Sequence, residues 1–379
     1  MTTTHAAPTF AHAPMRGPLR HVLLLCVWLA ACGRGARGTP DDTPGPSSGA
    51  VAWADRLTVN GTSLEVRARG DHASLPLLLV IHGGPGFAMI DLLHTHVPAL
   101  EHDFVVVSYD QRGAGLSYSE NVDPASMTLA QFVEDAHAVR ARVLVHLGRI
   151  GDTRVYVLGH SMGTMIGLEL VKRFPDDYEG YIGAGQVVQV AENEQGSYDF
   201  ALAKARAAGN QEAIDALTCV GRPNDDFTYG PPAAAACDSL ADGFAVTNEW
   251  VGYFGGDLYG ETGSDAVEAA ILESAAYQGR EDPWSAGVEF SARLFDDPRV
   301  TAWDARVLHS DDTVPLFFFM GRHDYDTPAP LVEAYSKGIR GPHRLVWFEA
   351  SAHFPFYEEP TLFAARLKAI LKGTLLADE

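Results

Sequence analysis

The fold is decided by the stretch RVYVLGHSMGTMIGLELVKRF, which spans residues 154–174. Its first five residues form a short aliphatic and β-branched run that predicts a strand, and residues 162–174 predict a helix. The turn between them, Gly159-His160-Ser161-Met162-Gly163, fits the pattern G-x-S-x-G. Such a turn is so tight that the serine adopts a strained backbone and its hydroxyl is pushed into a cleft, with a helix N-terminus behind it that favours negative charge. Ser161 is therefore the candidate nucleophile.

A serine hydroxyl is a poor nucleophile at neutral pH, so a base must take its proton. His353 is the candidate base, because it follows the last expected strand, Arg344–Phe348, and precedes a terminal helix expected over Pro360–Leu371. His343 comes before that strand and so belongs at the opposite end of the sheet. Three other histidines adjoin special motifs in the wrong places for a base, and we interpret them as structural: His82, His160 and His323.

The imidazole of the base needs a carboxylate that fixes its tautomer and stabilises its cation. Asp324 directly follows the expected strand Leu316–Met320 and is the preferred candidate, and Asp326 is the alternative. The chain order serine, aspartate, histidine is typical of α/β-hydrolases.

The tetrahedral intermediate of acyl transfer needs two backbone N–H donors. We expect one from Met162, the residue after the nucleophile, and the other from the glycine-rich turn at 82–86. Gly83 or Gly84 supplies that second donor, since a missing side chain lets the backbone approach the oxyanion. Plain loop geometry is the alternative interpretation of this turn.

Short apolar runs alternate with helical spacing through most of the chain. Residues 51–68 alternate around Asn60-Gly61, which predicts a hairpin, and the apolar spacing over 128–147 predicts a helix with Thr128 as its N-cap. Further strands are expected at Leu77–Ile81, Phe104–Tyr109 and Tyr181–Gly183. This pattern predicts the α/β class, an α/β-hydrolase fold whose mostly parallel, doubly wound sheet carries a helical cap insertion. All the candidate residues lie at the carboxyl ends of strands, where such sheets bind ligands.

The composition excludes some functions. A net charge of −21 over 379 residues offers no basic field for nucleic acid. The four cysteines form no C-x-x-C pair and no cluster with metal-ligand spacing, so we expect no metal. The expected chemistry requires no cofactor. The expected partner is a small-molecule or short-peptide substrate.

The N-terminus has the arrangement of an export signal. Basic residues from Arg16 precede a short apolar run, residues 22–31, that is too short to span a membrane. The run ends Leu29-Ala30-Ala31-Cys32, which resembles the lipobox of bacterial lipoproteins, in which cleavage leaves a lipid-bearing cysteine, here Cys32. The resemblance implies a lipid-anchored protein of the bacterial cell envelope, and an ordinary cleaved secretory signal is the alternative. Met15 opens a complete signal by itself, so translation could start there rather than at Met1.

The expected organisation is a signal over 1–31, a flexible tether rich in Gly, Pro and Ser over 32–50, a hydrolase core over 51–185 and 314–379, and a cap over 186–313. An alanine-rich helical stretch is expected in the cap over Tyr198–Leu217. An exported context permits disulfides, so we expect a bridge between Cys219 and Cys237, with two free buried thiols as the alternative.

The segments His82-Gly-Gly-Pro-Gly86 and Asp110-Gln-Arg-Gly-Ala-Gly-Leu-Ser117 together resemble the paired signatures of prolyl aminopeptidases (proline iminopeptidases) and related serine aminopeptidases. The similarity covers about residues 60–185 and 313–372. It implies Ser161, Asp324 and His353 as the triad, a helical cap after the sixth strand, and release of an N-terminal residue, often proline, from short peptides. Arg112 is expected to be structural.

Cap carboxylates hold the substrate's α-ammonium group in that family, and the candidates here are Glu192, Glu194 and Glu249. None matches a family motif, and a solvated helix face is the alternative for each. An exported aminopeptidase is the preferred function. A carboxylesterase, lipase or small-molecule amidase would share every catalytic residue, and a non-catalytic binding protein on the same fold is the remaining alternative.

Overall fold

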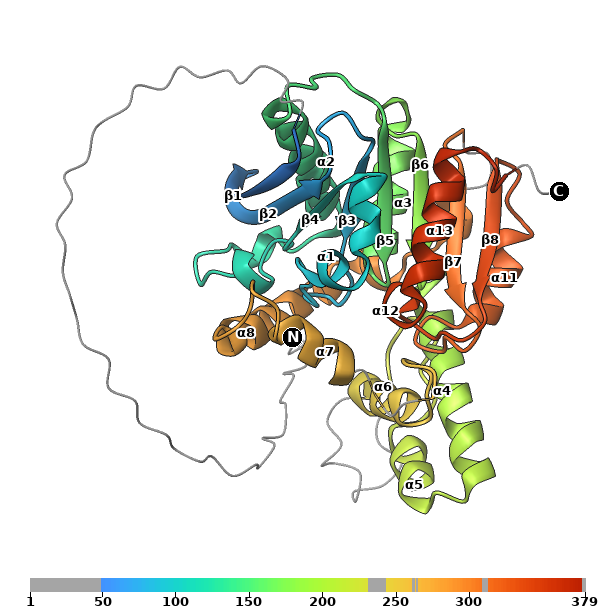
Figure 1. Ribbon diagram of the computed structural model, residues 1–379. Coiled ribbons are helices and arrows are strands. Elements are labelled where there is room, and N and C mark those ends of the chain that lie inside the picture. The colour runs from blue at the N-terminus through green and yellow to red at the C-terminus, as the bar shows by residue number, and fades with distance from the viewer. Residues whose placement is uncertain (1–48, 231–242, 261–262, 264, 309–312, 377–379) are drawn as a thin grey trace, which may run out of the picture.

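The computed structural model describes residues 49–230, 243–260, 263, 265–308 and 313–376 (Figure 1). One mixed sheet of eight strands organises this part of the chain, in the order β1-β2-β4-β3-β5-β6-β7-β8. β1 pairs antiparallel with β2, and β2 pairs antiparallel with β4, whereas every other neighbouring pair is parallel. The strands are β1 (Val51–Val59), β2 (Thr62–Gly70), β3 (Leu77–Ile81), β4 (Val105–Tyr109), β5 (Val155–His160), β6 (Gly180–Ala184), β7 (Leu316–Gly321) and β8 (His343–Phe348).

Helices cover both faces of this sheet (Figure 1). The core helices are α1 (Leu92–His96), α2 (Leu129–His146), α3 (Gly163–Arg173), α11 (Ala329–Ser336), α12 (Pro355–Glu358) and α13 (Pro360–Leu371). Short 3₁₀ helices are η1 (Pro98–His102), η2 (Gly115–Ser117), η3 (Pro124–Ser126), η4 (Pro175–Asp177) and η6 (Ala292–Asp296). The predicted mostly parallel, doubly wound α/β-hydrolase fold is thereby confirmed.

Alternate residues of the central strands face opposite layers. In β3, Leu77, Leu79 and Ile81 join a core with α2, α3 and α11, whereas Leu78 and Val80 join a second core with α1 and α13. Both sets are buried, which explains why the central strands appear in the sequence as continuous apolar runs.

Two local predictions are also confirmed. β1 and β2 form the hairpin around Asn60-Gly61. The side chain of Thr128 caps α2 by accepting a hydrogen bond from the backbone N–H of Gln131. Turn and cap residues therefore act here as their local chemistry dictates.

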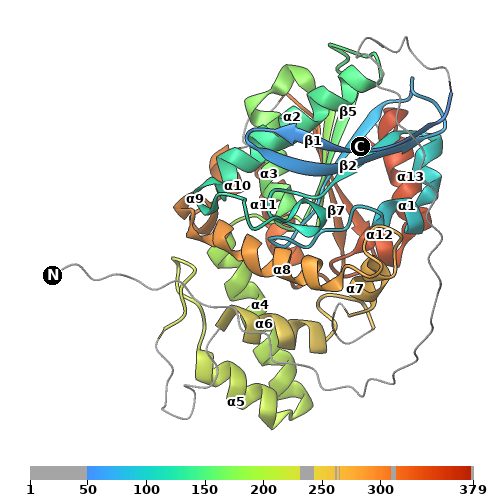
Figure 2. The same ribbon diagram turned by 90° about the vertical axis from the view of Figure 1, so that its left-hand side faces the viewer.

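The chain between β6 and β7 holds the inserted helices: α4 (Val190–Ala208), α5 (Gln211–Val220), α6 (Gly243–Tyr253), α7 (Asp265–Leu272), α8 (Glu281–Ser291), α9 (Pro298–Thr301) and α10 (Ala305–Leu308). α4, α5 and α6 share a small core of their own, which includes Tyr198, Leu217 and Trp250. Figure 2 shows these three helices grouped together at one end of the molecule. These three helices fall within residues 186–313, the range expected for the cap.

The helical stretch expected over 198–217 is in fact two helices. Gly209 ends α4 in the left-handed conformation, with φ of 64°, and Asn210 caps α5 by accepting a hydrogen bond from the backbone N–H of Ala213. Within the described ranges, none of the helices combines the length and the apolar character that crossing a membrane requires. The expected signal over 1–31 lies outside these ranges, as does nearly all of the tether.

Candidate active site

Ser161 stands at a sharp turn between β5 and α3. Its φ of 53° is one of three left-handed values among the described non-glycine residues. A Cβ at Gly163 would run into the Ile81 carbonyl and would lie 2.6 Å from the carbonyl oxygen of His82. Only glycine therefore lets α3 begin this close to β3, and that closeness forces the strained backbone at Ser161. The structure thus contains the elbow that the G-x-S-x-G pattern predicts.

The glycine-rich turn lies directly against the candidate nucleophile. A Cβ at Gly83 would sit 2.7 Å from the Cβ of Ser161, so the Gly83 backbone touches Ser161 with no side chain between them. Gly84 follows with φ of 116°, and Met162 is the N-cap residue of α3. The backbones of Gly83 and Met162 therefore lie next to Ser161, and Gly84 adjoins Gly83 along the chain.

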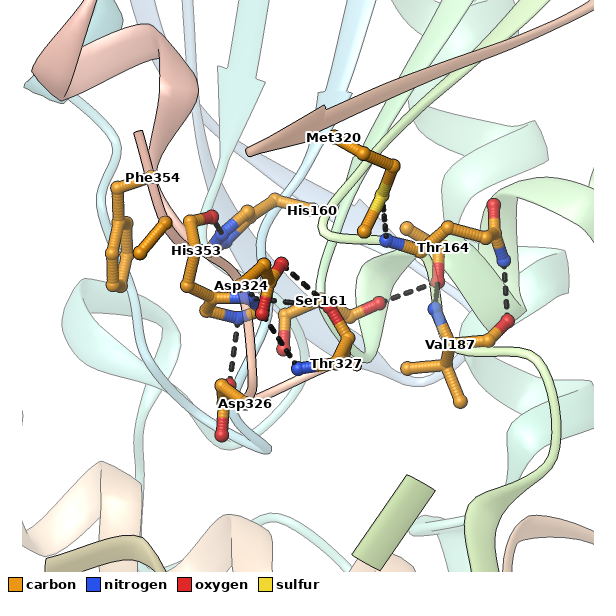
Figure 3. A network of polar contacts seen from close by, with 12 residues as sticks. His160, Ser161, Thr164, Val187, Met320, Asp324, Asp326, Thr327, His353 and Phe354 are labelled. Carbon is orange, nitrogen blue, oxygen red and sulfur yellow. Dashed lines mark hydrogen bonds and ion pairs between the residues drawn. The ribbon is translucent and has the colours of Figure 1, made fainter. Parts of the chain in front are cut away.

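Asp324 and His353 form a buried pair (Figure 3). The Nδ1 atom of His353 lies 3.0 Å from Oδ2 of Asp324. Thr327 donates to the same carboxylate twice, from its backbone N–H to Oδ1 and from its hydroxyl to Oδ2, each at 2.8 Å. Asp324 is therefore fixed by three donors and binds the imidazole at Nδ1, which is the position expected of the orienting acid.

Asp326 occupies the other edge of the same imidazole. Its Oδ2 lies 2.8 Å from Nε2 of His353. Burial opposes a charge on His353, but Asp326 and Asp324 outweigh it and raise the pKa of the imidazole well above its ordinary value. Within the described residues, the Ser161 hydroxyl makes no hydrogen bond to His353, although Figure 3 shows both side chains in the same region. The imidazole thus lies between two carboxylates that favour its protonated form.

Several contacts hold the loop that carries His353. Glu358 accepts hydrogen bonds from the backbone N–H groups of Ala352, at 2.9 Å, and Phe354, at 3.2 Å, on either side of the histidine. His160 holds the carbonyl oxygen of His353 through Nε2 at 3.0 Å. Burial and the charge on His353 keep the pKa of His160 well below its ordinary value, so His160 is neutral and donates this bond.

The insertion reaches the same loops. The backbone N–H of His353 donates to the carbonyl of Asp257 at 2.8 Å, and the N–H of Tyr325 donates to the carbonyl of Gly256 at 3.1 Å. Burial, with the nearby Asp326 charge, raises the pKa of Asp257 to about 8. Sequence reasoning missed both Asp257 and Glu358, because no motif marks them.

The segment Asp110–Ser117 is structural, as predicted for Arg112. The guanidinium of Arg112 is buried and makes two bonds of 2.9 Å to the carboxylate of Asp135 on α2. Asp110 accepts from the hydroxyl of Tyr277 at 2.5 Å and from the N–H of Leu116 at 2.7 Å. Burial outweighs these two bonds and raises the pKa of Asp110 to about 7.

The three cap glutamates lie in different surroundings. Glu192 is exposed and pairs with Arg306 at 2.7 Å. Glu194 is buried and accepts a hydrogen bond from Tyr229, whose hydroxyl also contacts Thr247 at 2.7 Å. Glu249 is exposed on α6. Two of the three glutamates thus already interact with other side chains of the protein. The carboxylates that contact His353 are those of Asp324 and Asp326 instead.

The cysteine predictions fall mostly outside the described residues. Cys219 is disulfide-bonded, whereas Cys32 and Cys237 both lie in segments that the structure does not describe. The pairing of Cys219 with Cys237 and the lipid on Cys32 stay predictions.

The fold and this site define a class, the hydrolases of the α/β-hydrolase fold. A family model described as "alpha/beta hydrolase fold" matches residues 76–200. The "Probable aminopeptidase YbaC" of Bacillus subtilis (strain 168) is 30% identical over 324 residues, which are 85% of this chain and 97% of that protein. The chain therefore belongs to the α/β-hydrolase superfamily.

Solved structures agree on the fold. A proline iminopeptidase-related protein from Thermus thermophilus superimposes with a TM-score of 0.57 at 20% identity, over 86% of this chain and 99% of its own. An esterase from Rhodococcus sp. ECU1013 gives 0.56 at 18% identity, over 85% of this chain and 98% of its own. The same architecture thus occurs in proteins described as a peptidase relative and as an esterase.

Proposed function

We propose that the chain is a serine hydrolase that works through an acyl-enzyme, with Ser161 as nucleophile, His353 as base and Asp324 as the orienting acid. The observation that carries this proposal is the 3.0 Å contact between Nδ1 of His353 and Asp324, beside a serine with φ of 53°. In the first step the neutral form of His353 takes the hydroxyl proton at Nε2 while Oγ of Ser161 attacks the carbonyl carbon. The proton then passes to the leaving group as its bond to the acyl carbon breaks.

In the second step His353 takes a proton from water, whose oxygen attacks the acyl carbon. His353 then gives that proton to Oγ of Ser161 as the bond between Oγ and the acyl carbon breaks. The negative oxygen in both steps is stabilised by backbone N–H groups of Met162 and of Gly83 or Gly84. The direct contact between the Gly83 backbone and Ser161 supports this assignment of the oxyanion donors. No metal or cofactor takes part in this scheme.

The proposed substrate is a short peptide from which the N-terminal residue, with proline as one candidate, is released. The similarity to a probable aminopeptidase over 97% of that protein's length supports this choice. The acidic surroundings of His353 support it as well, because the Asp326 carboxylate suits an acyl group that carries an ammonium.

An esterase is the second candidate function. Glu192 and Glu194, which were expected to hold the ammonium group, are bound to Arg306 and Tyr229. The test offers the purified protein proline and alanine p-nitroanilides beside p-nitrophenyl esters. We expect turnover of both classes, and turnover of esters without amides would reject the aminopeptidase.

We also propose that the chain is exported and lipid-anchored at Cys32, as the lipobox-like segment 29–32 suggests. Palmitate labelling in a bacterial host tests this. We expect label in the wild-type protein and none in Cys32→Ser, and equal label in both would contradict the anchor.

A further inference from the structure

Two carboxylates flank the imidazole of His353, and they are held very differently. Asp324 receives two hydrogen bonds from Thr327 in addition to its contact with His353, and it is fully buried. The carboxylate of Asp326 has His353 as its one partner among the described residues, and its side chain is 27% exposed. Asp324 is therefore held in place by the protein, whereas the Asp326 carboxylate can pair with another cation that reaches it from solvent.

Asp326 also lies where the core meets the insertion. Its backbone carbonyl accepts a hydrogen bond from the hydroxyl of Ser197 on α4, at 3.3 Å. Gly196, the preceding residue of the same helix, lies so close to Pro328 that an added Cβ would be 2.8 Å from that ring. The loop that carries Asp326 is therefore held against the inserted helix, both at Asp326 itself and two residues beyond it.

We propose that Asp326 restrains His353 in the resting enzyme by holding its Nε2 edge. A substrate with a free ammonium group beside the scissile carbonyl pairs with the Asp326 carboxylate instead, and His353 is then free to act as the base. This inference rests on the proposed function, because it assumes that Ser161 and His353 act as nucleophile and base. It assigns Asp326 the role of a specificity-determining residue.

The charges at Nε2 determine what activation requires. To act as a base, His353 must give its Nε2 proton to solvent at the partly exposed edge beside Asp326 and turn the freed lone pair toward the hydroxyl of Ser161. That loss leaves the Asp326 carboxylate without its cation, at a place where it has no other partner among the described residues. A substrate ammonium restores the pairing, whereas a neutral acyl group leaves the carboxylate unpaired, which is unfavourable in a partly buried site.

The pH dependence has a definite sign. The charged or titratable groups that face His353 and its loop are Asp324, Asp326, His160, Asp257 and Glu358. Asp326 favours the protonated imidazole, so its removal lowers the pKa of His353. The base is then neutral over a wider range, and the acidic limb of the kcat/KM profile moves to lower pH.

The test compares two substrates that differ in one charge, alanine p-nitroanilide and N-acetyl-alanine p-nitroanilide. The variant is Asp326→Asn, and the control is Asp199→Asn, which removes an exposed carboxylate that pairs with Arg222 on the insertion. We expect the wild-type preference for the free amine to fall about tenfold in Asp326→Asn and to stay unchanged in the control. An unchanged preference in an active Asp326→Asn enzyme would overturn the proposal.

A second measurement separates this proposal from the proposed function. The pH profile of kcat/KM with p-nitrophenyl acetate is recorded for the wild type, for Asp326→Asn and, should that variant fail to fold, for Asp326→Ser. We expect the acidic limb to move to lower pH, and an unmoved limb overturns the restraint. A wild-type enzyme that cleaves the ester but neither anilide rejects the aminopeptidase, while the shift of the ester profile still decides the role of Asp326.

Discussion

Gly185→Ala should disable the site without removing any group that takes part in the chemistry. Gly185 follows β6 with φ of 58°, and an added Cβ would lie 2.7 Å from Cε1 and 2.8 Å from Nδ1 of His353. Carbon atoms ordinarily approach to about 3.5–4.0 Å, so the methyl group intrudes on the imidazole by about 1 Å.

The size of the effect follows from this intrusion. The imidazole is 3% exposed and cannot retreat into solvent, so it must move relative to Asp324 and Ser161. A displacement of about 1 Å in a catalytic group costs on the order of 100-fold in rate. The left-handed backbone separately costs an alanine about 1–2 kcal/mol of stability.

Gly209→Ala is the matched control. Gly209 has nearly the same φ, 64°, and an added Cβ would meet nothing within 4 Å. Gly209→Ala should lose the stability that the left-handed backbone costs, and Gly185→Ala somewhat more in thermal unfolding because of the buried overlap. Only Gly185→Ala should lose kcat/KM with p-nitrophenyl acetate, by about 100-fold. A folded Gly185→Ala enzyme with the activity of Gly209→Ala would refute the placement of His353.

Three further predictions concern the supports of the site. Tyr277→Phe removes the hydrogen bonds that the Tyr277 hydroxyl makes with Asp110 and with the N–H of Ile90, so the free energy of unfolding should fall by about 2–4 kcal/mol in urea titrations. A loss below about 0.5 kcal/mol would contradict the role of that hydroxyl. Burial raises the pKa of Asp110 from 3.8 to about 7, so the folded state binds this proton more tightly than the unfolded state, and the free energy of unfolding should decline as pH rises between those values. Asp110→Asn should flatten that decline, and an equal decline in both proteins would contradict the role of Asp110. The carboxylate of Glu358 accepts from three backbone N–H groups, those of Ala352 and Phe354 at Oε2 and that of Tyr259 at Oε1. Glu358→Gln leaves one acceptor oxygen for these three donors and turns an NH2 group toward at least one of them, so kcat/KM should drop about tenfold or more with the fold retained by circular dichroism. Full activity would show that the histidine loop needs no such clamp.

The sequence was most informative where local chemistry determines geometry. The central strands and the G-x-S-x-G turn could be predicted because a buried parallel strand must be apolar and a tight elbow must be glycine. The break between α4 and α5 also has a local signal, since Gly209-Asn210 combines a helix stop with an N-cap, yet the alanine-rich composition around it favoured one helix.

The surroundings of His353 could not be predicted in this way. The spacing of Asp324 and Asp326 places both on one loop, but which nitrogen each carboxylate faces depends on the loop's conformation. Asp257 reaches His353 only through packing of the insertion on the core, and no local pattern encodes that contact. The burial of Glu194 likewise depends on how α4 meets its neighbours.

Covalent labelling reads out the identity of the nucleophile most directly. The wild-type protein is treated with a fluorophosphonate, digested and mapped by mass spectrometry, in parallel with a folded Ser161→Ala variant. We predict one adduct, on the peptide that contains Ser161, and none in the variant. A wild-type enzyme that turns over substrate while Ser161 stays unlabelled, or that carries the adduct on another residue, would contradict the central claim.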